Sequence, residues 1–268
     1  RGRKRGGVLS NARGYVWWSE TYQSWVIPAY HPAYVLRGKP DLEPVITHDL
    51  QRAVEVARDG WTEREVRYTS DPGPAALHQW VLEFNVAAEG NPSLRLVADI
   101  ETSEKGENEE ELDVEGHDDT EPHELNLSTI DRIGFCWKPR FALSVPNQAQ
   151  YVPAMKHLLG HPCAKSFHSA GFDVPRIRAA GFPLEGEIHD TRVSWHLLHS
   201  ALPTGLGFVA TYTCPDQPMW KHLSAAQPAL YSCIDADIQC QSDQVIEAEL
   251  RVSGLWHLYE RHVLQLNP

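Results

Sequence analysis

The sequence Leu-Arg-Leu-Val-Ala-Asp-Ile-Glu-Thr, at residues 94–102, decides the fold of this chain. Its branched apolar residues predict a buried β-strand that ends in two carboxylates. Because side chains alternate across a strand, we expect Asp99 and Glu101 on one side of the sheet and Ile100 on the other. Neighbouring carboxylates repel, and a divalent cation such as Mg²⁺ or Mn²⁺ would relieve that repulsion. The alternative is a strand end with two solvated acids.

Length and composition indicate a globular protein. The chain has 268 residues, 42% of them hydrophobic, which allows one large domain or two of ordinary size. No apolar run approaches the roughly 18 residues that cross a bilayer, and the basic start differs from a signal peptide. The five cysteines lack Cys-x-x-Cys spacing and cannot all pair with one another. These features favour a reduced, cytoplasmic setting with no membrane partner.

The charge is distributed unevenly along the chain. Residues 103–125 contain eleven acids and one lysine, and so account for about −10 of the net charge of −12. This segment is expected to be a solvated surface loop, although His117 and His123 could form a metal trap among the acids. The rest of the chain is close to neutral. The net charge therefore does not exclude a nucleic-acid partner.

The chain after the acidic segment alternates strands and helices. Residues 130–137 and 140–146 predict two strands that continue an antiparallel meander from the first. A short strand then leads into His-Ser-Ala-Gly-Phe-Asp at residues 168–173, which places Asp173 near a helix start. This alternation favours an α/β fold.

A long helix is predicted over residues 228–253. Its start is marked by Pro228, and Tyr231 and Asp235 lie four positions apart on one face. The three segments with Asp-Ile-Glu-Thr, His-Ser-Ala-Gly-Phe-Asp and Tyr-Ser-Cys-Ile-Asp-Ala-Asp together resemble the exonuclease motifs of the DEDD superfamily, in its tyrosine-bearing branch. The likeness is strongest to the 3′–5′ proofreading domain of family A DNA polymerases. It implies a ribonuclease H-like exonuclease fold, with a mixed central sheet flanked by helices.

The resemblance also implies two divalent metal ions, Mg²⁺ or Mn²⁺, that hydrolyse a phosphodiester. Asp99 would bridge both ions, and Glu101 and Asp235 would hold the ion that carries the attacking water. Asp173 would hold the second ion, and Tyr231 would orient the water for attack.

Other residues of the motifs are expected to assist. His168, Ser169 and Phe172 are candidates for contact with the substrate, and Trp195 could also stack on a base, although packing is an alternative for each. Ser169 departs from the family pattern, which has Asn there. The resemblance matches Asp190 and Asp237 as well, and their expected role is to support the site, Asp190 as a helix cap, and not to ligate metal.

A second resemblance concerns the start of the chain. Residues 1–60 resemble the C-terminal end of the uracil-DNA glycosylase superfamily, a small α/β fragment in which His31 occupies the place of a uracil-binding histidine. Residues 61–92 are expected to form a connector with a helix, and residues 93–255 the exonuclease domain. Residues 256–268 would begin a helix leading to a polymerase domain outside this chain.

The predicted function is removal of nucleoside monophosphates from DNA 3′ ends, as proofreading in DNA replication. The partners would be a single-stranded DNA 3′ end and a polymerase domain of the same full-length protein, in a bacterium or a phage-infected host. Two alternatives are an RNA 3′-trimming nuclease of the ribonuclease D type and a non-catalytic DNA-binding module.

Overall fold

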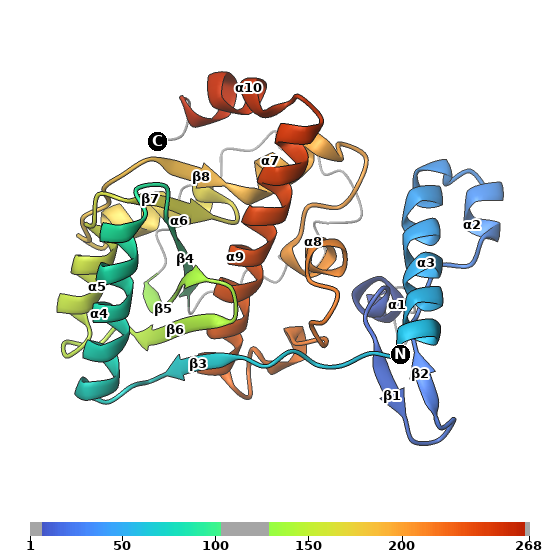
Figure 1. Cartoon of the computed structure of the whole chain (residues 1–268), viewed down its shortest axis with the longest axis horizontal. Coiled ribbons are helices and arrows are strands. Elements are labelled where there is room, and N and C mark those ends of the chain that lie inside the picture. Colours follow the sequence, from blue (N-terminus) through green and yellow to red (C-terminus); the bar gives the residue numbers. More distant parts are fainter. Residues whose placement is uncertain (1–6, 103–128, 266–268) are drawn as a thin grey trace.

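The computed structural model describes residues 7–102 and 129–265, and a mixed sheet lies at its centre (Figure 1). In spatial order, the strands of this sheet are β3 (Arg67–Ser70), β6 (Phe141–Pro146), β5 (Ile130–Lys138), β4 (Arg95–Thr102), β7 (Ala164–Phe167) and β8 (Ile188–Asp190). β4, β5 and β6 form an antiparallel meander, and the other three strands pair in parallel. The predicted meander and the mixed sheet are confirmed.

Helices cover both faces of the sheet (Figure 1). The first face packs against α4 (Pro74–Gly90), α5 (Val152–Leu159) and α6 (Ala170–Ala179). The long helix α9 (Pro228–Val252) crosses the other face, beside α7 (Thr191–Leu198) and α8 (Leu206–Thr213). No helix within the described ranges is both long and apolar enough to cross a membrane.

Alternation along β4 divides its side chains between the two faces. Leu96, Ala98 and Ile100 are buried in the core shared with α4, α5 and α6. Val97 is buried in the smaller core on the side of α9. Asp99 and Glu101 follow Val97 at intervals of two, so β4 directs both acids toward α9.

A glycine allows α9 to approach the sheet at this point. Gly134 on β5 is the register partner of Asp99. A Cβ atom at Gly134 would lie 2.5 Å from the carbonyl oxygen of Ser232 and 2.8 Å from its Oγ. Any larger residue would therefore push α9, and with it Asp235, away from β4.

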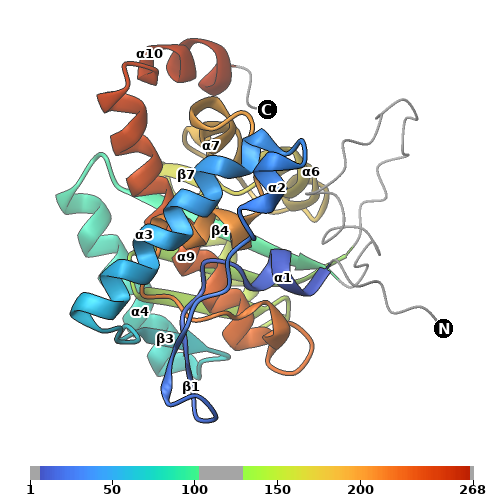
Figure 2. The same cartoon turned by 90° about the vertical axis from the view of Figure 1, so that its right-hand side faces the viewer.

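The N-terminal segment forms a group of its own beside α8 (Figures 1 and 2). Its elements are α1 (Gly7–Ala12), β1 (Trp17–Ser19), β2 (Ser24–Val26), α2 (Ala33–Leu36), η1 (Pro40–Leu42) and α3 (Glu43–Asp59). Arg13 is buried and forms an ion pair with Asp49 at 2.6 Å, and it also donates a hydrogen bond to Thr211 Oγ1 on α8 at 3.0 Å. The segment is thus attached to the rest of the protein through α8.

Parts of the predicted connector belong to the sheet layer. β3 forms the edge of the sheet, and Trp80 and Phe84 of α4 are buried in its core. At the other end, α10 (Trp256–Tyr259) is a single short helix followed by a π turn, η3 (Glu260–Leu264). Tyr259 is buried against Trp195, so this segment folds back onto α7 and α9 within the described residues.

We predict that Gly134→Ala lowers the free energy of unfolding by about 1–3 kcal/mol, because the new methyl group overlaps the backbone of α9. Urea denaturation would measure the change. Gly90→Ala is the matched control, since a Cβ there meets nothing within 4 Å and should change stability by less than about 0.5 kcal/mol. Equal stability of the two variants would contradict the close approach of α9.

Candidate metal centre

Three carboxylates from two elements converge between β4 and α9. Asp99 and Glu101 come from β4, and Asp235 from the second turn of α9. One oxygen of each lies within 4.8 Å of an oxygen of the other two. Asp235 is buried, and the other two acids are partly buried. β4 also has a register shift between Glu101 and Thr102, beside the cluster, after which Thr102 pairs with Ile130.

The electrostatics of the cluster favour a cation. The pKa of Asp99 is raised well above its ordinary value by burial first, and then by the charges of Glu101, Asp235 and Asp173. The neighbouring carboxylates therefore make ionisation of Asp99 more costly. The donors are all carboxylate oxygens, the set that suits Mg²⁺ or Mn²⁺, so these residues fit a divalent metal ion.

Asp173, the fourth predicted ligand, lies close to the cluster but outside the group of three. It sits in the first turn of α6 and is 4% exposed, and its charge contributes to the raised pKa of Asp99. The structure thus brings three of the four predicted acids together within 4.8 Å and places the fourth on the neighbouring helix.

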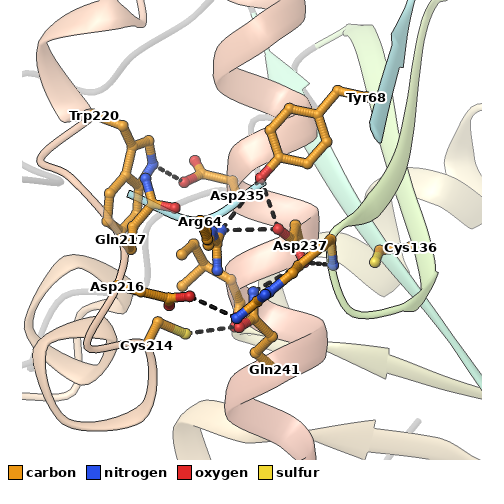
Figure 3. Close-up of polar contacts among 12 residues, drawn as sticks. Arg64, Tyr68, Cys136, Cys214, Asp216, Gln217, Trp220, Asp235, Asp237 and Gln241 are labelled. Atoms are coloured by element: carbon orange, nitrogen blue, oxygen red, sulfur yellow. Dashed lines mark hydrogen bonds and ion pairs between the residues drawn. The ribbon is translucent and has the colours of Figure 1, made fainter. Parts of the chain in front are cut away.

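Two residues that the sequence interpretation missed hold Asp235 in place. Trp220 donates from Nε1 to Asp235 Oδ1 at 2.5 Å (Figure 3). Lys221, which begins the turn η2 (Lys221–Leu223), donates from Nζ to both oxygens of Asp235, at 3.1 and 3.2 Å. The one available signal was Lys221 itself, which is the only lysine or arginine between Cys214 and Gln227.

The hydroxyl of Tyr231 belongs to the same site. Lys221 Nζ lies 2.9 Å from Tyr231 Oη and donates a hydrogen bond to it. The pKa of Tyr231 is raised by burial and by the negative charges of Asp235 and Glu101. Tyr231 therefore remains a neutral phenol at neutral pH, able to donate a hydrogen bond but not to act as a base.

Asp237 is directed toward Arg64 and Tyr68 and holds the edge of the sheet (Figure 3). It is fully buried and pairs with Arg64 at 2.8 Å. It also accepts hydrogen bonds from Tyr68 Oη at 2.6 Å and from the backbone N–H of Arg140 at 2.6 Å. These contacts join β3 and the turn between β5 and β6 to α9, which is a structural task.

Asp190 organises the beginnings of two helices. As the N-cap of α7, its side chain accepts from the backbone N–H groups of Arg192 and Val193. It also accepts from the N–H groups of Ser169 and Ala170, at 3.3 and 2.7 Å. Ser169 has φ of 96°, a left-handed conformation that asparagine tolerates better than serine. Serine at this position therefore carries a backbone cost.

The candidates for substrate contact are already engaged within the protein. His168 contacts Thr191 Oγ1 through Nδ1 and donates to the Thr204 carbonyl from Nε2, both at 2.8 Å. Phe172 is partly buried and lies under the Arg176 guanidinium, 3.5 Å from the ring centroid. Trp195 is 1% exposed and packs in the core, so it offers no face to a base.

The candidate for nucleobase binding near the start of the chain is not part of the acid cluster. His31 is exposed, and its Nδ1 accepts from the backbone N–H of Ala33 at 3.1 Å, as in an ordinary turn. His117 and His123 lie outside the described residues.

A mixed sheet flanked by helices, with acids at β4 and α9, defines the ribonuclease H-like exonuclease fold. Among solved structures, Brucella melitensis NrnC with bound Mg²⁺ is similar, with a TM-score of 0.50 and 15% identity. The match covers 74% of this chain and 88% of that one.

Two further structures are similar over shorter shares of their own chains. The POL domain of Pol1 from M. smegmatis, in complex with DNA primer-template and dNTP, has a TM-score of 0.49 and 15% identity, over 70% of this chain and 28% of that one. Escherichia coli RNase D has a TM-score of 0.44 and 14% identity, over 73% and 47%. No protein-family model and no curated protein matches the chain.

We predict that His168 makes the protein sensitive to acid. Burial lowers its pKa from 6.5 to about 3, so the folded state keeps the ring neutral while the unfolded state takes up a proton below pH 6.5. Stability is thus lost as pH falls from about 6.5 toward 3, by at most about 1.4 kcal/mol per pH unit from this residue. His168→Gln should flatten that dependence in urea melts between pH 6 and pH 4. An unchanged slope would show that His168 is protonated in the fold.

Proposed function

We propose that this protein is a metal-dependent 3′–5′ exonuclease that removes nucleoside monophosphates from DNA 3′ ends. The observation that carries the proposal is the convergence of Asp99, Glu101 and Asp235 beside the hydroxyl of Tyr231. The NrnC structure with the same fold holds Mg²⁺, an ion that suits these carboxylates.

Divalent ions in this cluster would lower the pKa of the attacking water and stabilise the charge on the leaving 3′ oxygen. Asp99 would hold both ions, Glu101 and Asp235 the first, and Asp173 the second. Tyr231, kept as a neutral phenol, would hydrogen-bond the attacking water and orient it toward phosphorus. Trp220 would keep the carboxylate of Asp235 in its position during the reaction.

The finer role is proofreading for a family A polymerase domain of the same full-length protein. Its support is the order and spacing of the three motifs, together with the resemblance of residues 1–60 to a glycosylase end. Cleavage of RNA 3′ ends is the alternative substrate choice. Competition between DNA and RNA strands of equal sequence, labelled at the 5′ end, would decide between them.

The central experiment compares the wild type with Asp99→Asn on a 5′-labelled single strand with Mg²⁺. We expect the variant to lose on the order of 10²- to 10³-fold in rate. Its stability in EDTA should equal or exceed that of the wild type, because the raised pKa of Asp99 means that its charge destabilises the metal-free fold. A loss of rate in this variant would then not be caused by unfolding.

Glu89→Gln, which replaces an exposed acid at the end of α4, serves as the control and should keep the wild-type rate. Degradation by Asp99→Asn at the wild-type rate would refute the proposed function. Activity of the wild type that persists in EDTA would refute it equally.

A further inference from the structure

A lysine ammonium contacts the carboxylate oxygens of Asp235 that a metal ion would also use. Lys221 Nζ contacts both carboxylate oxygens of Asp235, at 3.1 and 3.2 Å, and Tyr231 Oη at 2.9 Å. The oxygens of Asp99 and Glu101 complete the cluster within 4.8 Å. A metal ion bound by Asp235 would therefore lie beside the positive charge of the lysine and compete with it for the same oxygens.

The charge of Lys221 acts on the whole cluster. An ammonium is positively charged at neutral pH, and its Nζ lies 3.1 and 3.2 Å from the two oxygens of Asp235. The ammonium is therefore positively charged in the metal-free fold, and it offsets repulsion that a divalent ion would otherwise relieve.

The two donors to Asp235 differ in their freedom to move. Trp220 is 1% exposed and its indole is neutral, so it can keep its hydrogen bond when a cation arrives. The side chain of Lys221 is 36% exposed and has a flexible stem, so its ammonium can leave Asp235 for solvent or for a phosphate.

We propose that Lys221 is a resident counter-cation, which holds Asp235 and Tyr231 in the metal-free site and competes with the divalent ion for Asp235. This inference rests on the proposed function, because it takes the cluster to be the metal site. Lys221 is a positioning residue in this account. The metal-free protein keeps its acids in place, and metal binding is weaker than three carboxylates alone would give.

The test is calorimetric titration of Mn²⁺ into the full chain as wild type, Lys221→Met and Lys156→Met. Lys156 is an exposed lysine on α5, away from the cluster, and serves as the matched control. We expect Lys221→Met to bind Mn²⁺ on the order of tenfold more tightly than the wild type. Lys156→Met should bind as the wild type does.

A second readout needs no metal. In EDTA, Lys221→Met should melt about 2–4 °C below the wild type, because the acids lose their counter-charge, and saturating Mn²⁺ should remove that difference. Unchanged or weaker Mn²⁺ binding by Lys221→Met overturns the inference. If that variant does not fold, Lys221→Gln, which is neutral but still donates a hydrogen bond, is subject to the same expectation.

The two hypotheses fail separately. If the wild type degrades DNA but Lys221→Met binds Mn²⁺ no more tightly, the proposed exonuclease activity stands and the counter-cation role of Lys221 is rejected. If Lys221→Met binds Mn²⁺ more tightly but the wild type degrades no nucleic acid, the counter-cation role stands and the exonuclease activity is rejected.

Discussion

The repulsion among three carboxylates held within 4.8 Å is the constraint on which this structure depends. Such a group is stable only where positive charge and hydrogen-bond donors reach it, and the protein supplies both from one short segment, Trp220 and Lys221. The fold must therefore bring β4, α9 and the turn before α9 together within a few ångströms.

Backbone geometry achieves the approach with few special residues. Alternation along β4 sends Asp99 and Glu101 to the face of α9, and Gly134 on the neighbouring strand leaves room for that helix. Asp235 and Asp237 are two positions apart on α9, and they diverge to different tasks, one at the acid cluster and one at the edge of the sheet (Figure 3). A single helix thereby joins the site to the fold that supports it.

Local sequence pattern was sufficient for the elements that carry the acids. The apolar alternation of β4 and the proline at the start of α9 predicted both, and α9 runs from Pro228 to Val252 as expected. The contacts of Asp237 with Arg64 and of Asp235 with Lys221 were beyond reach, because they join residues 173 and 14 positions apart in loops and strand ends without a periodic signal. His168 shows the same limit, since its two partners come from other segments.

The N-terminal segment packs beside the acid site, and contacts therefore link residues 1–60 to the predicted exonuclease region 93–255. Tyr15 is buried, donates a hydrogen bond to the Gly207 carbonyl at 2.6 Å and packs edge-on against Trp220, with 6.0 Å between ring centroids. Trp220 in turn donates to Asp235. Because a neutral indole holds a carboxylate only as firmly as its own ring is held, the packing of Tyr15 contributes to the position of Asp235. Two residues before Tyr15, Arg13 forms a buried ion pair with Asp49, which anchors this part of the chain to α3.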